Sequence, residues 1–263
     1  EYYMSNSENI NSHIQMPKCV LRNFADEQQT VHYFDFEENA IKIGRAASLN
    51  TELGYYSQNT EDYLRDNIET PFGKVMAFLK GISKDDTFSV SDTLFDDVRK
   101  FLYSLMSRSP NMLDSVTKSS AFFQFLPKQA QHDYVAVTGI QIAQNRGLFD
   151  DWQITFMIND SNTPFVLPQN GIYQFGLRTC EDACLNLPIT PQISIVLFPK
   201  KHIDKFVDGN MVKLFHFSED ETAQTLNEKA FLSEKVNNKM RVFSNSQEEI
   251  QRLERLLEKG ESE

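Results

Sequence analysis

Basic residues, cysteine and long apolar runs are all scarce in this chain of 263 residues. Lys and Arg number 26 against 37 Asp and Glu, which gives a formal net charge of −11. Proteins that bind duplex DNA place cations against its phosphates, so this balance disfavours duplex DNA as a partner, and anionic membrane surfaces likewise. No stretch reaches the roughly 18 apolar residues of a membrane span, so we expect no membrane contact. Because no secretory signal is visible near Glu1, we expect a cytoplasmic protein.

Three cysteines, Cys19, Cys180 and Cys184, are too few for a disulfide scaffold. Cys180 and Cys184 have a spacing that could place both thiols on one helical face. A zinc site needs two more ligands, and no other Cys or His lies close in sequence, so we expect structural thiols. Metalloprotease, phosphate-loop, dinucleotide and nucleophile-elbow motifs are also absent, so no motif specifies a metal or a cofactor.

Apolar residues are plentiful: 40% of the chain is hydrophobic and 12% aromatic, with 21 Phe. This is enough for a sizeable core, and 263 residues are near the upper limit for one domain. Residues 30–36 and 40–43 are two short β-prone runs joined by a polar turn, which predicts a hairpin. Residues 45–59 show no clean period and are predicted to be a loop.

Helical patterns dominate the middle of the chain. Thr60 is a plausible cap for a helix that ends near Glu69, and Pro71 suits the first position of a second helix that ends at Gly81. Further helices are predicted from residue 91 or 92 onward, between Pro110 and Pro127, and over 131–147, where a strand is the alternative.

The C-terminal half favours strands. Residues 152–158 alternate in polarity like a strand with one apolar face. Shorter strands are predicted at 164–167, 172–175, 193–197, 211–217 and 240–243, with a helix over 219–234. Ser246 to Glu249 form a capping box that opens an amphipathic helix.

Runs of helices followed by runs of strands are typical of an α+β fold. We therefore predict a single domain over 13–245, with a helical part at about 60–147. Its strand-rich part, at about 151–245, holds a mixed or antiparallel sheet with peripheral helices. The amphipathic helix at 246–263 follows the domain.

Several short segments together resemble a bacterial family known as domain of unknown function 4238. They are Pro17 with Leu21-Arg-Asn-Phe-Ala25, Tyr33, Glu69, Trp152, Phe165, Pro188-Ile-Thr-Pro191, Leu226-Asn227 and Arg241-Val-Phe243. The resemblance implies a histidine three residues before Pro17 and an aspartate four residues after Phe165. This chain has Ile14 and Gln169 at those places, with His13 one position off register. A glutamine amide neither binds a divalent cation nor accepts a proton as a carboxylate does, which indicates a degenerate site.

His13, Arg22 and Glu69 are the candidate catalytic residues. In the functional interpretation, Arg22 orients an anion while His13 or Glu69 moves a proton. In the structural interpretation, which we favour, Arg22 pairs with Glu69 and clamps the N-terminal segment onto the first helix, because structural ion pairs outnumber catalytic ones. Either interpretation requires the Leu21–Phe24 element to fold against the late strand and turn, so that Phe24 and Phe165 share one interior.

Three function classes follow. The favoured one is a protein-interaction or regulatory module, carried by a bacterium, a phage or another mobile element, with a protein partner. The alternative is a metal-dependent hydrolase or nuclease acting in defence or toxicity, with His13, Glu69 and a further carboxylate. The third, a nucleic-acid binder without catalysis, is disfavoured by the acidic charge.

Overall fold

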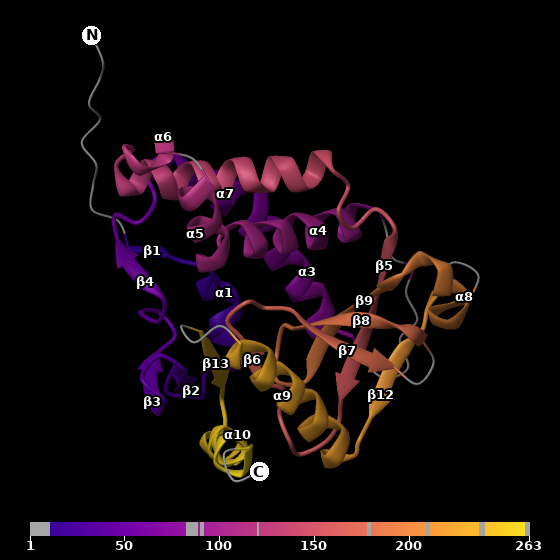
Figure 1. The fold of residues 1–263 in the computed structure, drawn as a ribbon. Helices are drawn as coiled ribbons and strands as arrows, with labels where there is room; N and C mark the ends of the chain where they lie inside the picture. Colours follow the sequence, from indigo (N-terminus) through magenta and orange to yellow (C-terminus); the bar gives the residue numbers. More distant parts are fainter. Residues whose placement is uncertain are drawn as a thin grey trace.

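The computed structural model describes residues 11–82, 89, 92–119, 121–177, 180–208, 211–236 and 240–260. Figure 1 shows a layer of helices above two sheets, with two further helices beneath them. The protein has the α+β fold that the sequence predicts.

The first sheet joins the two ends of the chain. Strands β2 (Thr30–Asp35) and β3 (Ala40–Arg45) form the predicted hairpin. β13 (Arg241–Ser244) pairs antiparallel with β2 on one side and with β6 (Leu167–Pro168) on the other. The order β3-β2-β13-β6 therefore places N-terminal and C-terminal strands side by side.

The predicted loop at 45–59 is partly wrong. Within it, β4 (Thr51–Leu53) pairs antiparallel with β1 (Asn11–His13). Strands of three residues are too short to show a period, which explains why the sequence gives no sign of them.

The first helices form one continuous stretch. α2 (Gln58–Leu64) passes through a π-helical turn (Arg65–Glu69) into α3 (Thr70–Lys80). The predicted break before Pro71 is wrong, because a wide turn upstream can accommodate the proline ring and its missing N–H. The predicted cap is also wrong: Ser57 caps α2, its Oγ accepting a hydrogen bond from the amide of Thr60 at 3.4 Å.

The rest of the helical layer agrees with the prediction. It consists of α4 (Asp92–Ser107), α5 (Pro110–Ser119), α6 (Ala121–Gln124) and α7 (Lys128–Asn145). Residue 91, one of the two predicted starts of α4, lies outside the described residues. The stretch that was open to helix or strand is the helix α7, which packs on α4.

The second sheet has five strands in the order β12-β5-β9-β8-β7. They are β5 (Trp152–Asn159), β7 (Tyr173–Leu177), β8 (Cys180–Pro188), β9 (Ile193–Pro199) and β12 (Leu214–Phe217). β12 runs parallel to β5 and the other pairs are antiparallel, so the predicted mixed sheet is confirmed. The helical interpretation of Cys180 and Cys184 is wrong, because both lie in β8, where residues four apart are about 13 Å from each other.

Short elements connect these layers. They are α1 (Lys18–Leu21), the 3₁₀ turns η1 (Arg22–Phe24) and η3 (Lys200–His202), α8 (Ile203–Phe206), β10 (Val207–Asp208) and β11 (Met211–Val212). β10 and β11 pair with each other, so the predicted strand at 211–217 is divided between β11 and β12.

Two helices lie under the sheets. α9 (Asp220–Lys235) packs on β6, β7 and β13, and α10 (Gln247–Gly260) packs on β2, β3 and β13. The predicted capping box is half formed: Ser246 Oγ accepts from the Glu249 amide at 3.2 Å. The Glu249 carboxylate instead binds Asn227 and Arg252.

One hydrophobic core runs through both sheets and the helical layer. Phe24 and Phe165 are both fully buried within it, so the opening element and the late strand share an interior as predicted. Within the described residues, no helix combines the length and apolar character needed to cross a membrane.

Candidate functional site

The three candidate residues occupy different surroundings. His13 ends β1 and is partly buried, Glu69 ends the π-helical turn with 29% of its side chain exposed, and Arg22 in η1 is exposed. Glu69 pairs with Arg108 and not with Arg22. The predicted Arg22–Glu69 clamp is therefore wrong, and the Arg108–Glu69 pair instead joins the end of α4 to the π-helical turn.

Arg108 directly follows α4 and is only 4% exposed. Its Nη1 lies 3.3 Å from Oε1 of Glu69, while Nε and Nη2 have no hydrogen-bond partner in the described part of the chain. Sequence reasoning missed this residue. An arginine just past a helix is usually an exposed complement to the helix dipole, and nothing local indicates burial.

Burial and Arg108 together control the ionisation of the N-terminal segment. Burial, together with the cations of Arg108 and Lys18, lowers the pKa of His13 to about 4. Burial raises the pKa of the Cys19 thiol to about 12, helped by the charge of Glu69, and burial also raises the pKa of Glu61. At neutral pH, His13 is thus a neutral imidazole and Cys19 is an unreactive thiol.

This environment does not suit a metal ion. The guanidinium of Arg108, which is paired with Glu69 and close enough to His13 to shift its pKa, would repel a divalent cation placed between those two side chains. Across the described ranges, no three His, Cys, Asp or Glu side chains are grouped so that they could hold one.

Ile14 and Gln169, the residues at the two places where the sequence resemblance implies a histidine and an aspartate, lie in segments that touch. The backbone N–H of Ile14 donates to the Asn50 carbonyl at 2.8 Å, and the backbone N–H of the buried Gln169 donates to the Arg241 carbonyl at 2.9 Å. Between them, Gln15 Nε2 donates to Asn170 Oδ1 at 2.9 Å. The N-terminal segment therefore lies against the late turn, as predicted.

The Asn170 side of this contact is also bonded to a buried carboxylate. Glu234 of α9 is fully buried and accepts from the backbone amide of Asn170 at 2.9 Å and from its Nδ2 at 3.0 Å. Burial raises the pKa of Glu234 to about 8. Both of its hydrogen bonds are structural, and sequence reasoning could not separate it from the other acids of a charged helix.

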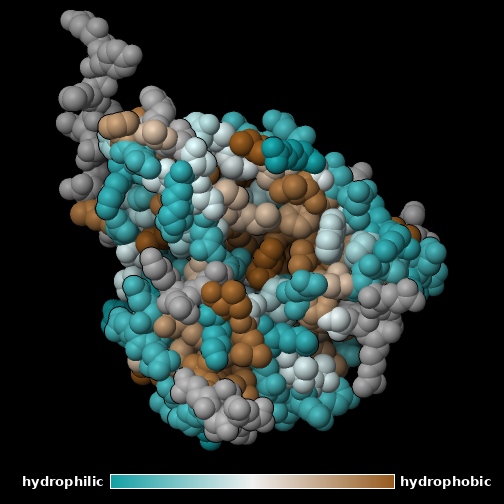
Figure 2. All heavy atoms as spheres, in the orientation of Figure 1, coloured by the Kyte–Doolittle hydropathy of each residue, from teal (hydrophilic) through white to brown (hydrophobic). Residues whose placement is uncertain are grey.

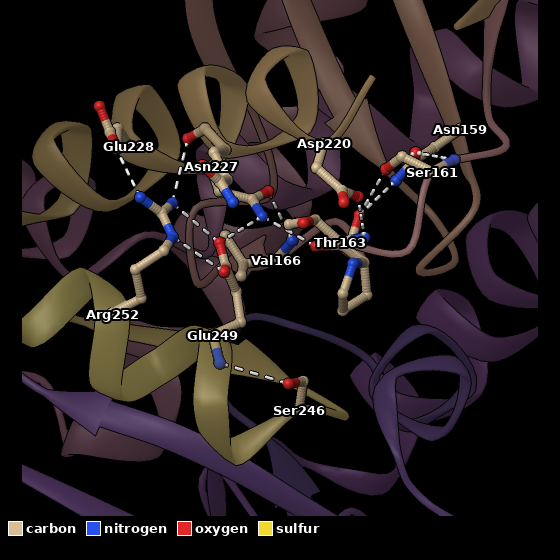
Figure 3. A network of polar contacts seen from close by, with 12 residues as sticks. Asn159, Ser161, Thr163, Val166, Asp220, Asn227, Glu228, Ser246, Glu249 and Arg252 are labelled. Atoms are coloured by element: carbon tan, nitrogen blue, oxygen red, sulfur yellow. Dashed lines mark hydrogen bonds and ion pairs between the residues drawn. The ribbon is translucent and has the colours of Figure 1, made fainter. Parts of the chain in front are cut away.

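Two asparagines in the segments that carry the resemblance hold loops in place. Asn227 Nδ2 donates to the Pro164 carbonyl at 2.8 Å and to Oε1 of Glu249 at 2.7 Å, while its Oδ1 accepts from the Val166 amide at 3.0 Å (Figure 3). Asn23 Nδ2 donates to the Ile189 carbonyl at 2.8 Å. The predicted strand at 164–167 is wrong except at Leu167, because β6 begins there; these asparagines position the extended segment around Phe165 and the Pro188–Pro191 turn, which is a role in folding.

An apolar hollow of about 190 Å³ lies between α4, α5 and α7. Its lining includes Tyr103, Met106, Met112, Val116, Tyr134, Ile142 and Leu148. A second hollow of about 390 Å³ shares Met106 and Met112 and extends to Asn170. Figure 2 shows hydrophobic side chains gathered in the depression between the helical layer and the sheets. We call the two hollows together the helical groove.

Comparison with known proteins gives one match. The model of a family described as protein of unknown function (DUF4238) matches residues 15–255. The chain belongs to the DUF4238 family. No curated protein and no solved structure matches this DUF4238 chain.

The family match begins at residue 15, so it includes Gln169 but not Ile14, the two places where the sequence resemblance implies an aspartate and a histidine. In this DUF4238 protein, Ile14 contributes backbone hydrogen bonds, and Gln169 is a buried amide whose Oε1 has no hydrogen-bond partner in the described structure. Ile14 has no group that carries a proton or ligates a metal, and the neutral amide of Gln169 lacks the negative charge that a carboxylate uses for both. The helical groove is therefore a better candidate for a binding site than the surroundings of Ile14 and Gln169.

Proposed function

We propose that this DUF4238 protein is an interaction module that binds an amphipathic helix of a partner protein in the helical groove. The observation that carries the proposal is a set of exposed apolar side chains around the groove. Met112 is 38% exposed, Tyr134 49%, Ile142 47% and Leu148 45%. Large apolar side chains grouped on a rim of this kind are typical of protein-binding surfaces.

The size and apolar lining of the hollow between α4, α5 and α7 favour the anchoring side chains of a helix over a whole small molecule. The hollow between the three helices, at about 190 Å³, is smaller than the roughly 300–1,000 Å³ of most small-molecule sites. It has room for one or two anchoring side chains. Met106 and Met112 line both this hollow and the second one, and flexible methionines adapt well to apolar anchors at helical spacing.

Charge narrows the choice of partner. Among the described residues that line the groove, Arg146 is the single charged one. A partner helix with an acidic residue beside its apolar anchors would complement it. A second copy of this chain is less suitable, because two molecules with a net charge of −11 repel each other.

Photo-crosslinking in the native host tests the proposal. A photoreactive phenylalanine analogue replaces Ile142 in the groove, and in a control replaces Ile43, which is 59% exposed on β3. We expect position 142, and not position 43, to crosslink to a helical segment of one partner. A peptide of that segment should bind the wild type, and Ile142→Lys should abolish its binding.

The proposed pairing between Arg146 and an acidic residue of the partner is tested with the same peptide. Arg146→Glu should weaken binding at least about five-fold, and changing the acidic residue of the peptide to Lys should restore it. Crosslinks from position 142 only to another copy of the chain would overturn the proposal, as would crosslinks to no protein. A peptide that binds Ile142→Lys as tightly as wild type would also overturn it.

A further inference from the structure

Three polar side chains from distant parts of the sequence form a row of hydrogen bonds inside the protein. Glu234 of α9 accepts from the backbone N–H of Asn170 at 2.9 Å through Oε1 and from Asn170 Nδ2 at 3.0 Å through Oε2. Asn170 Oδ1 accepts from Gln15 Nε2 at 2.9 Å. Gln15 and Glu234 are both fully buried. The row therefore joins α9 to the segment that follows β1, through the turn at residues 168–171.

The backbone of this turn has little freedom to move. The Gly171 N–H donates to the Pro168 carbonyl at 2.8 Å, and Gly171 has a φ of +79°. A Cβ at Gly171 would lie 2.5 Å from Cδ1 of Leu105, so the turn packs closely on α4. A change in the row has to come from rotation of its side chains, because the chain that carries Asn170 is held in place.

Glu234 has no neighbouring cation that balances its charge among the described residues. Burial raises the pKa of its carboxyl to about 8 against the opposing effect of the Asn170 N–H, and no charged side chain of the described residues contributes. Of the elements packed on α9, β6 carries no titratable group. The titratable groups on β7 and β13, and those of α10 that face α9, are bonded to other residues: Tyr173 to Asn186, Arg241 to Asp35, and Arg252 to Glu228 and Glu249.

The hydrogen bonds of Glu234 are those of an ionised carboxyl group, because both of its oxygens accept. When Glu234 takes up a proton from solvent on Oε2, that oxygen becomes a donor and faces another donor, Asn170 Nδ2. The conflict is removed if the Asn170 amide flips, so that Oδ1 accepts from the Glu234 O–H. Asn170 Nδ2 then faces Gln15 Nε2, where the same conflict arises.

Gln15 is able to complete the exchange. Its Oε1 is buried and has no hydrogen-bond partner in the described part of the chain. If the Gln15 amide also flips, Oε1 accepts from Asn170 Nδ2, and each contact of the row again joins one donor to one acceptor. The bond given up is that of Gln15 Nε2 with the Leu105 carbonyl, which at 3.5 Å is weak.

We infer that Glu234, Asn170 and Gln15 form a proton-operated switch, in which protonation of Glu234 flips both amides and reverses the hydrogen bonds between them. Two packings of the same residues are thus exchanged by one local change of charge. Asn170 also lines the second hollow of the helical groove, so the switch changes a residue of that surface. The inference does not rest on the proposed function, because no partner protein takes part in it.

NMR on the full chain tests the switch. The carboxyl carbon of Glu234 and the side-chain amides of Asn170 and Gln15 are followed between about pH 5 and 10, an interval that includes the expected midpoint. We expect all three to move in one transition with a shared midpoint. Nuclear Overhauser effects from the Asn170 Nδ2 protons should pass from the γ-methylene of Glu234 above the midpoint to that of Gln15 below it. The side-chain amide of Asn227, which donates to Glu249, is the control and should keep its contacts.

Two variants separate the flip from a simple effect of charge. Glu234→Gln has a donor in place of the O–H, so it should hold the low-pH arrangement at every pH, whereas the exposed Glu221→Gln should follow the wild type. Asn170→Ala interrupts the row, so the Gln15 amide should no longer follow the titration of Glu234.

Three results would overturn the inference. The first is a Glu234 carboxyl that does not titrate in this interval, or one that titrates while the contacts of the Asn170 Nδ2 protons stay the same. The second is the high-pH arrangement in Glu234→Gln. The third is a Gln15 amide that still follows Glu234 in Asn170→Ala, because it would then respond to the charge alone.

Discussion

Arg108 is the residue on which the ionisation of the N-terminal segment most visibly depends. Its guanidinium is buried, has one carboxylate partner in Glu69, and leaves Nε and Nη2 unpaired. Removing one member of a buried ion pair is usually harmful, whereas an apolar replacement of an incompletely paired charge costs less. This makes Arg108→Met a variant that should fold and still report on the charge.

We predict that Arg108→Met raises the pKa of His13 above its present value of about 4, because one of the cations that lower it is gone. The folded His13 holds its proton less tightly than the unfolded chain, so its contribution to stability is present above pH 6.5 and is lost as the pH falls toward 4. The variant should lose less stability over that interval. The pH titration of the His13 ring protons by NMR measures the shift. Lys118→Met, at an exposed position, is the control, and an unchanged His13 pKa in Arg108→Met would contradict the prediction.

For Glu234 we predict the opposite pH dependence from that of His13: its contribution to stability is lost as the pH rises. Burial raises the pKa of its carboxyl to about 8 from about 4.5, so the folded state holds the proton more tightly than the unfolded chain. The stabilising contribution is therefore complete below pH 4.5 and is lost as the pH rises through 8. Between pH 5 and 8, the unfolding free energy of the wild type should fall relative to that of Glu234→Gln, by roughly 3 kcal/mol or more.

Urea denaturation at several pH values measures this difference. Glu221→Gln, an exposed acid on the same helix, should follow the wild type at every pH. Parallel pH profiles for wild type and Glu234→Gln would show that the buried carboxyl does not titrate in this range.

At the scale of elements, the packing of α7 on α4 depends on a glycine. A Cβ at Gly139 would lie 2.6 Å from Cβ of the buried Ser107, so the two helices could not keep their separation. A Cβ added at Gly73 in α3 would have no atom within 4 Å. Alanine normally stabilises a helix interior over glycine by about 0.5–1 kcal/mol.

We therefore expect Gly73→Ala to stabilise the protein by about that amount and Gly139→Ala to destabilise it by about 1–3 kcal/mol through overpacking. Thermal and urea unfolding of both variants provide the comparison. A stabilising Gly139→Ala would mean that α7 can move away from α4 at little cost.

Asn227 links α9 and α10 to the segment around Phe165 that leads into β6. Asn227→Ala would leave the Val166 amide and the Pro164 carbonyl without their partner, whereas Glu249 would keep Arg252. Leaving buried polar groups unsatisfied costs about 1–3 kcal/mol each, so we expect a loss of about 3 kcal/mol in urea unfolding. Asn67→Ala, at an exposed site on the π-helical turn, is the control and should cost well under 1 kcal/mol. Equal losses in the two variants would contradict the structural role of Asn227.

Elements with a long, clear hydrophobic period were predictable from the sequence. Short elements, and elements that form only through contacts with distant segments, were not. β5 shows its alternation over eight residues and α4 keeps its apolar residues on one side over 16, so their types follow from local sequence, whereas the pattern of α7 also allowed a strand. β1 and β4 have three residues each and form only because they meet. Spacing misled the interpretation of Cys180 and Cys184, because positions four apart share a face in a strand as well as in a helix. Arg108 and Glu234 escaped prediction because their burial depends on elements far away in sequence.

At the scale of the whole molecule, the N-terminal and C-terminal parts of the chain share one sheet and one core. β13 inserts between the N-terminal strand β2 and β6, and one core joins the sheets to the helical layer. A single domain over 13–245 remains a prediction, and it has a direct consequence. No part can lose its packing without exposing the shared core, so unfolding should be a single cooperative transition.

Two probes that report on different layers can test this. Trp152, the only tryptophan, lies at the start of β5 and contacts Phe149, so its fluorescence follows the strand-rich part. Far-UV circular dichroism at the helical minimum follows mainly the helical layer. We expect the two urea transitions to coincide in the wild type. Gly139→Ala, which disturbs only the contact between α7 and α4, should shift the Trp152 transition by as much as the helical one. A Trp152 transition that stays in place while the helical one moves would mean that the helical layer unfolds as a separate domain, because coupling through one core requires both to move together.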